Sequence, residues 1–292
     1  MTVIARCFTD LSKRASTRSV RCGARTSSST APSNRIGHNA TVAEKQLDAV
    51  GIVLAQVNDE WDAQGSCFLF RSDVLALTAA HCVPEVLEPF AVSLPHLGTT
   101  LPVERIERHP TADIAMLFCT GEDTLTEIGV PTTAFLDGIG DWSVGETFYA
   151  YGYPTEGPTE DSTQAPVPRL FTGNFQRFMR YVSPRGYRFL AGEMSIPAPG
   201  GLSGGPLFRP WRGGPLFRPQ DPQIVLGVVA ANLDSYAVTD SILEVNDAGK
   251  EYREKSLRVI RYGVAVMLSG VADWLNARSP QRPGRVFHLQ QA

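Results

Sequence analysis

The sequence predicts an all-β fold, and three of its features indicate this class. Short runs of apolar, β-branched and aromatic residues recur along most of the chain. Prolines and glycines separate these runs, where turns are expected. No helical stretch interrupts the runs before residue 203. With 292 residues, 43% of them hydrophobic, the chain is long enough for one or two globular units with a sizeable core. A barrel or a sandwich is therefore expected.

The first half of the chain contains six candidate strands. They span residues 50–55, 65–70, 73–77, 90–94, 103–106 and 114–118. A turn is expected at residues 58–61, where Asn58 and Asp59 favour tight turns. Residues 122–141 then predict a crossover between two groups of strands.

A second group of strands follows the crossover. Candidates span residues 146–154, 170–173, 178–182, 187–195, 224–231 and 261–266. Residues 155–168 are polar and predict a mobile loop between the first two of these. Residues 271–275 predict a C-terminal helix, and residues 279–292 a loose tail. The second group therefore ends the folded part of the chain.

Residues 1–43 differ in composition from the rest of the chain. They contain seven lysines and arginines but only one acidic residue, Asp10, and they are rich in serine. This composition predicts a disordered basic tail. A secretory signal is not expected because no apolar core of 7–15 residues is present. We therefore expect an intracellular location, with an organelle transit peptide as the alternative.

The rest of the composition argues against two classes of partner. The net charge of −3 does not suggest a nucleic-acid-binding surface. No apolar run approaches the ~20 residues needed to span a membrane. No cysteine–histidine cluster has metal-ligand spacing, and neither a metal nor a cofactor is expected. The oligomeric state is left open.

The most informative stretch is residues 200–206, in which Ser203 stands among four glycines and a proline. Glycines allow positive φ and close approach of other atoms, which an exposed nucleophile with bare N–H groups beside it requires. Upstream, His81 follows one apolar run and Asp113 precedes another. A serine hydroxyl needs a base, and that base needs a carboxylate to orient it. The order His81, Asp113, Ser203 thus predicts a catalytic triad.

Together these motifs resemble the trypsin-like (chymotrypsin-fold) serine proteases, in particular the bacterial type. The stretches Thr-Ala-Ala-His-Cys, Asp-Ile-Ala and Gly-Leu-Ser-Gly-Gly-Pro carry the resemblance, which covers roughly residues 47–278. It implies two six-stranded antiparallel β-barrels and a C-terminal helix. The expected boundaries are residues 44–135 for the first barrel, with His81 and Asp113, and 136–278 for the second, with Ser203. The expected activity is that of a serine endopeptidase acting on polypeptides.

The resemblance also implies roles for residues around the triad. Gly201 and Ser203 would donate their N–H groups to an oxyanion. A substrate would lie as a strand along Ala230, Ala231 and Asn232. Pro197, with Ala198 beside it, would stand at the floor of the primary pocket, and Gly263 on its wall. These uncharged residues predict small or medium apolar side chains at the substrate position before the cleaved bond (P1). Leu202 replaces the aspartate that activates trypsin-type zymogens, so we expect it to pack in the core.

Three other interpretations fit part of the sequence, and the sequence argues against the first two. The Gly-Leu-Ser-Gly-Gly stretch also fits the nucleophile elbow of α/β-hydrolases, but those enzymes place their histidine after the serine, and here only His288 follows. A protease-like binding module would have lost a triad member, and none is lost. A non-peptide esterase on the same barrels stays possible.

Two further features of the sequence have no catalytic role assigned. Cys67 and Cys82 match a pair that many relatives bridge, but free thiols or a mixed state are expected here. The segment 204–210 recurs at 213–219 without the Leu-Ser, which predicts a tolerated duplication in a surface loop, with a substrate-contacting flap as the alternative. His96 and His109 are expected in loops.

Overall fold

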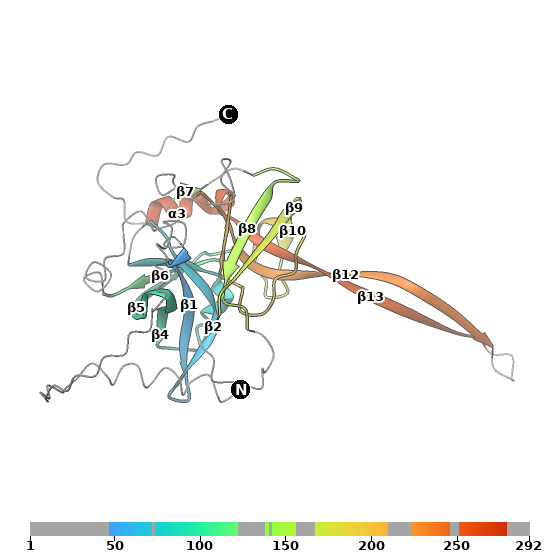
Figure 1. The fold of residues 1–292 in the computed structure, drawn as a ribbon, viewed down its shortest axis with the longest axis horizontal. Coiled ribbons are helices and arrows are strands. Elements are labelled where there is room, and N and C mark those ends of the chain that lie inside the picture. The colour runs from blue at the N-terminus through green and yellow to red at the C-terminus, as the bar shows by residue number, and fades with distance from the viewer. Residues whose placement is uncertain are drawn as a thin grey trace, which may run out of the picture.

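The computed structural model describes residues 47–71, 74–121, 138–139, 142–155, 167–209, 224–245 and 251–278. Within these residues it has two groups of antiparallel strands and a short C-terminal helix (Figure 1). The expected tails at residues 1–43 and 279–292 lie outside the described part of the chain, as do most of the expected crossover and the expected loop at 155–168. No helix among the described residues is long and apolar enough to cross a membrane.

The first group is a closed six-stranded barrel with the order β1-β2-β3-β6-β5-β4. Its strands are β1 (Val50–Val57), β2 (Glu60–Leu69), β3 (Leu75–Thr78), β4 (Phe90–Leu94), β5 (Thr99–Arg108) and β6 (Ala115–Cys119). The short 3-10 helices η2 (Ala80–Cys82) and η3 (Pro95–Leu97) follow β3 and β4.

The second group is also a ring of six strands. Its order is β11-β8-β9-β10-β13-β12, and the pairing of β11 with β12 closes it. The strands are β8 (Thr147–Gly152), β9 (Arg169–Val182), β10 (Arg188–Met194), β11 (Pro206–Phe208), β12 (Ile224–Val245) and β13 (Glu251–Met267). The short β7 (Gly138–Ile139) pairs parallel to β12 outside this ring. The fold class predicted from the sequence is thus confirmed.

Three hydrophobic clusters hold these rings. One lies within the first barrel and includes Val53, Val92 and Leu117, and another within the second includes Phe148 and Phe175. The third cluster joins side chains of both barrels and the C-terminal helix. Alternate residues of β1 point into the first and the third cluster, which explains why its apolar run is continuous rather than alternating. The two barrels are therefore packed together through a shared core.

Several element boundaries differ from the predictions. The turn after β1 has only two residues, Asn58 and Asp59, both with positive φ, and Glu60 and Trp61 already belong to β2. Such a two-residue turn suits a tight hairpin, which extends both strands. The two strands expected at 170–173 and 178–182 form one continuous strand, β9. The helix η5 (Leu268–Val271) precedes the expected C-terminal helix α3 (Ala272–Arg278).

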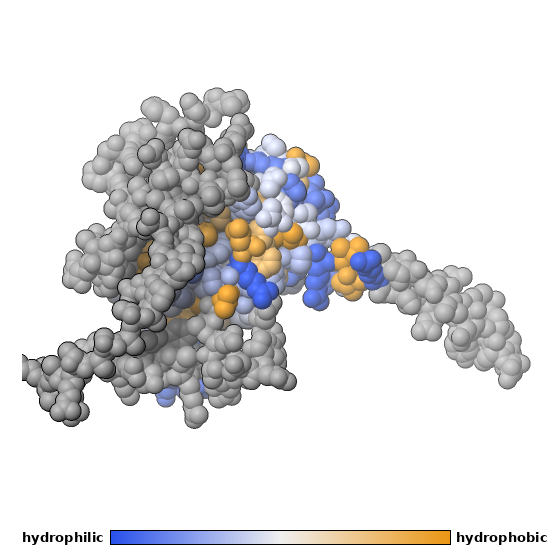
Figure 2. Space-filling view, in the orientation of Figure 1, coloured by the Kyte–Doolittle hydropathy of each residue, from blue (hydrophilic) through white to orange (hydrophobic). Residues whose placement is uncertain are grey.

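The largest difference from the predictions is a long two-stranded ribbon. The strands expected at 224–231 and 261–266 continue as β12 and β13, paired as far as Val245 and Glu251. The ribbon projects from the barrels (Figure 1). At its described base Tyr236, Val259 and Ile260 are exposed, and Figure 2 shows hydrophobic atoms on its surface there. Polar residues interrupt the apolar pattern of this stretch, and for that reason the sequence did not predict it.

Candidate active site

The site begins at one end of the β3–β6 pair in the first barrel. Thr78, the last residue of β3, pairs with Ala115, the first residue of β6. In an antiparallel pair, the segment that leaves one strand lies beside the segment that enters the other. His81, just after β3, and Asp113, just before β6, are therefore brought together by this register.

Asp113 holds His81 with both carboxylate oxygens. Its Oδ1 accepts a hydrogen bond from the backbone N–H of His81 at 2.9 Å. Its Oδ2 lies 2.7 Å from Nδ1 of the imidazole. The carboxylate is buried, whereas the His81 ring is 15% exposed. Nδ1 is thus tied to the carboxylate, and Nε2 is left for a substrate or a nucleophile.

The surroundings of His81 favour its charged form. Burial of the ring opposes protonation, but the hydrogen bond to Asp113 and the adjacent Cys82 outweigh it and raise the pKa of His81 above its ordinary value. An imidazolium formed at this position would therefore be stabilised, as a base that receives a proton requires.

Ser203 lies in the second barrel, between β10 and β11, but its backbone is bound by the first. Its carbonyl oxygen accepts a hydrogen bond from the N–H of Ser66 at 2.7 Å. The thiol of Cys82, next to His81, also points at this oxygen, at 3.6 Å. Gly65 makes the approach possible, because a Cβ there would meet the same carbonyl at 2.8 Å. The serine segment thus lies beside the turn that carries His81.

Ser66 connects the two barrels at this place, and the sequence motifs did not reveal it. Its buried hydroxyl donates to the carbonyl of Gly201 at 2.7 Å and accepts from the N–H of Tyr153 at 2.9 Å. Its own carbonyl accepts from Thr78 at 2.8 Å. The only sign of this role in the sequence is that Ser66, a small polar residue, directly precedes the apolar run at residues 67–70.

The backbone around Ser203 is arranged so that two N–H groups stay unused. The carbonyl of Gly200 accepts from Thr155 N–H at 2.7 Å, and that of Leu202 from Gly205 N–H at 2.9 Å. In a trans peptide the N–H points opposite to the carbonyl. The N–H groups of Gly201 and Ser203 therefore point away from these partners, and neither donates to another described residue. Gly201 has φ of +82°, a conformation that favours glycine.

Leu202 is completely buried, as expected from the sequence. It packs in the cluster of the second barrel with Phe148, Met194 and Ala198. The residue before Ser203 is therefore fixed by apolar contacts, with no ion pair needed.

The candidate substrate-binding residues lie on neighbouring strands and one loop. Asn232 pairs with Gly263 across β12 and β13, and Ala231 with Val264, so that Ala230 is the extra residue of a bulge. Ala198 is buried, but Pro197, expected at the pocket floor, is exposed.

The walls of the expected pocket are tied to one another. The side-chain amide of Asn232 bonds to both backbone groups of Ala198. The N–H of Gly263 donates to the carbonyl of Ile196 at 2.7 Å, and a Cβ on Gly263 would collide with Met194. The space beside Gly263 is therefore already occupied by a side chain.

The described cysteines form no disulfide bond. Cys67, Cys82 and Cys119 are buried free thiols, in line with the expectation, and Cys7 and Cys22 lie outside the described residues. Burial raises the pKa of Cys119 to about 12 and raises that of Cys67 well above its ordinary value.

Among the described residues no group of three His, Cys, Asp or Glu side chains could hold a metal ion. The second copy of the duplicated segment is likewise outside the described part.

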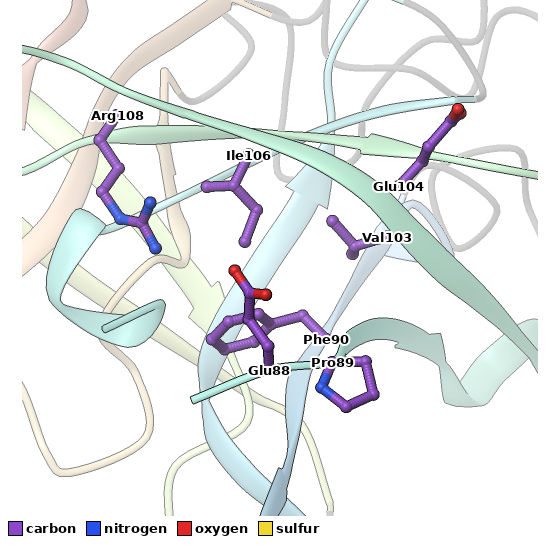
Figure 3. Close-up of a pocket in the computed structure, with 7 residues that line it drawn as sticks. All are labelled: Glu88, Pro89, Phe90, Val103, Glu104, Ile106 and Arg108. Atoms are coloured by element: carbon purple, nitrogen blue, oxygen red, sulfur yellow. The ribbon is translucent and has the colours of Figure 1, made fainter. Parts of the chain in front are cut away.

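A separate pocket of about 420 Å³ opens on the wall of the first barrel. It is lined by Glu88, Pro89, Phe90, Val103, Glu104, Ile106 and Arg108 (Figure 3). Two bonds from the Arg108 guanidinium to the carbonyl of Val83 fix that side chain. None of the triad candidates lines it.

The sequence and the fold are similar to those of known peptidases. The sequence model of the family described as "Trypsin-like peptidase domain" matches residues 65–220, more than half of the chain. The chain belongs to the trypsin-like peptidases. It is accordingly a serine-type endopeptidase by family, with the chymotrypsin-like fold. No curated protein matched the sequence.

Two solved structures illustrate how this trypsin-like peptidase compares with its fold relatives. The active form of the Rv3671c protease from M. tuberculosis has a TM-score of 0.52 and 16% identity, over 91% of this chain and 96% of that one. The HtrA-type protease AlgW with a tripeptide has a TM-score of 0.51 and 14% identity, over 81% of this chain and 62% of that one. At these identities the likeness shows a shared fold alone.

Proposed function

We propose that this peptidase cleaves polypeptides with Ser203 as nucleophile, His81 as general base and Asp113 as the residue that orients the base. The observation that carries the proposal is that Asp113 binds His81 while the chain neighbour of His81 and Ser66 bind the backbone of Ser203. Asp113 binds Nδ1 of the ring at 2.7 Å, and the Ser203 carbonyl is bound by Ser66 and by Cys82, the neighbour of His81.

In this mechanism His81 takes the proton of the Ser203 hydroxyl as the serine attacks the scissile carbonyl. The N–H groups of Gly201 and Ser203 receive the negative charge that develops on the carbonyl oxygen. His81 then gives its proton to the leaving amine, and water releases the acyl group by the same steps in reverse. Asp113 keeps the ring in one tautomer throughout.

The proposed substrate lies in extended form along Ala230, Ala231 and Asn232 of β12. Backbone hydrogen bonds of this kind give affinity with little sequence preference. The pairing of β11 with the other edge of β12 ends at Val228, and this supports the placement because β11 does not occupy that edge from Ala230 onward. Sequence preference then comes from the P1 pocket near Ala198 and Gly263.

The test uses a fluorophosphonate probe and a panel of peptide and ester substrates. The wild type is expected to be labelled and to hydrolyse peptides, whereas Ser203→Ala is expected to do neither. His81→Ala is expected to lose a similar factor in turnover, because triad members act as a unit. Undiminished peptide hydrolysis by Ser203→Ala would overturn the assignment, and hydrolysis of esters alone would favour the esterase alternative.

A further inference from the structure

The loop that carries Asp113 is shaped by a histidine four residues before it. Nδ1 of His109 accepts hydrogen bonds from the backbone N–H groups of Thr111, at 3.1 Å, and Ala112, at 2.8 Å. The His109 N–H donates to the carbonyl of Ile114 at 3.0 Å, which closes the loop on the far side of Asp113. The backbone on both sides of the carboxylate is thus bound to one residue.

The His109 ring is itself held by the C-terminal helix. It packs edge-on against Trp274 of α3, with ring centroids 5.1 Å apart. Arg278, one turn later, lies over the Trp274 ring and pairs with Glu107 of β5 at 3.1 Å. The helix α3 therefore braces the loop that holds Asp113.

The second barrel contacts the same loop once more. The N–H of Arg188, at the start of β10, donates to the carbonyl of Thr111 at 2.7 Å. Within the loop, then, one peptide is bound by β10 and two N–H groups are bound by the His109 ring. Such restraint matters because a misplacement of about 1 Å in a catalytic group can cost about 100-fold in rate.

Nδ1 can accept these bonds only when it carries no proton. Burial of the ring and the positive charge of Arg278 lower the pKa of His109, so that the neutral ring is favoured. The nearby carboxylate of Glu107 is paired with both Arg278 and Arg105. The chemical state of His109 therefore fits the role of an acceptor.

We propose that His109, braced by Trp274, is a positioning residue that holds the Asp113 carboxylate on His81. It touches neither the substrate nor the nucleophile, and its effect passes through Asp113. The inference rests on the proposed function for the claim that the Asp113–His81 pair is catalytic.

Three substitutions of His109 test this role. The side-chain oxygen of Asn is bonded to Cγ, just as Nδ1 of His is, so it can accept the same two hydrogen bonds. The oxygen of Gln lies one bond further from the backbone, and Ala has no side-chain acceptor. We expect kcat to fall about 10- to 100-fold in His109→Ala and His109→Gln with KM within twofold. His109→Asn is expected to stay within about threefold of the wild type.

A second measurement does not depend on activity. NMR titration of the His81 imidazole is expected to give a raised pKa in the wild type and in His109→Asn, and a lower one in the Ala and Gln variants. Equal kcat and equal His81 pKa in the Asn and Gln variants would overturn the proposal, even if His109→Ala fails to fold. A wild type without peptidase activity whose His81 pKa still falls in His109→Gln would instead overturn the proposed function and leave the positioning role standing.

Discussion

The side-chain amide of Asn232 makes two hydrogen bonds with the backbone of Ala198, donating to its carbonyl and accepting from its N–H, both at 2.7 Å. The two residues lie 34 positions apart in the sequence, on β12 and on the segment that follows β10. In the proposed function Asn232 lies on the substrate-binding strand and Ala198 at the floor of the P1 pocket. The amide would then connect the two and limit the depth of the pocket.

The first prediction is that P1 is restricted to small or medium apolar side chains and that Asn232 enforces this. Asn232→Gly is expected to raise kcat/KM for substrates with large apolar P1 residues at least tenfold, because the amide no longer connects the strand to the pocket floor. A peptide library varied at P1 measures the change. Asp234→Asn, two residues along the same strand in a surface ion pair, is the matched control and should leave the profile unchanged. Efficient cleavage after Lys or Arg by the wild type would contradict this interpretation, since no carboxylate is expected in the pocket.

The second prediction concerns pH. Because the pKa of His81 is raised, the neutral ring that serves as base forms only above the ordinary value of about 6.5. The acid limb of kcat/KM should therefore have its midpoint above about 6.5. The same shift stabilises the fold at low pH, and this contribution should be lost as pH rises through the raised pKa.

Asp113→Asn provides the control for that pH profile. It removes the charge that favours the imidazolium, so the remaining activity should titrate at lower pH. Turnover should drop by about 10⁴-fold because the tautomer is no longer fixed. An unchanged midpoint in this variant would show that Asp113 does not set the pKa of His81.

The third prediction concerns Ser66. Ser66→Ala leaves the carbonyl of Gly201 and the N–H of Tyr153 without their partner in a buried place, which should cost about 1–3 kcal/mol in the free energy of unfolding. Turnover should fall as well, because the Gly201 peptide would lose its anchor. Urea unfolding and kcat measure the two effects. Ser93→Ala, at another buried serine on β4, is the control and should leave kcat unchanged.

The fold class was predicted correctly from the sequence, and so was the pairing of His81 with Asp113, because both depend on local patterns. Apolar runs between turn residues mark strands, and three short motifs mark His81, Asp113 and Ser203. The sequence did not predict Ser66, Asn232's bond to Ala198 or the role of His109, because each depends on a contact between residues that only the fold brings together. The ribbon was missed for another reason: polar residues interrupt the apolar runs of its two strands, so no regular apolar pattern marks them in the sequence.

The fourth prediction follows from Leu202. Because this residue is fixed by apolar packing, activity should not require a new N-terminus. A shortened chain that begins near Thr41 and carries an N-terminal tag should match the activity of the full chain. Leu202→Ala should lower the free energy of unfolding by about 2–5 kcal/mol. Activity that appears only after an N-terminal cut, and that is lost when the new amine is blocked, would contradict this view of Leu202.

The fifth prediction concerns the duplicated segment. The described ends of this connection already meet, since the N–H of Arg209 donates to the carbonyl of Ile224 at 3.2 Å. Deletion of residues 211–219 should therefore change the free energy of unfolding by only about 1 kcal/mol. If the segment contacts substrate instead, KM would rise in the deletion variant while its stability stays the same.

The contacts of Ser66 also set an order in time. The hydroxyl of Ser66 and its acceptor on Gly201 are 135 residues apart, so the first barrel is synthesised long before its partner loop. His81 and Asp113 can pair as soon as β6 has formed, but the Ser203 segment is anchored only when the second barrel docks onto Ser66. Under the proposed function, a half-made chain on the ribosome would therefore hold the base without the nucleophile. The layout of the fold would then delay the assembly of the proposed site until the second barrel is complete.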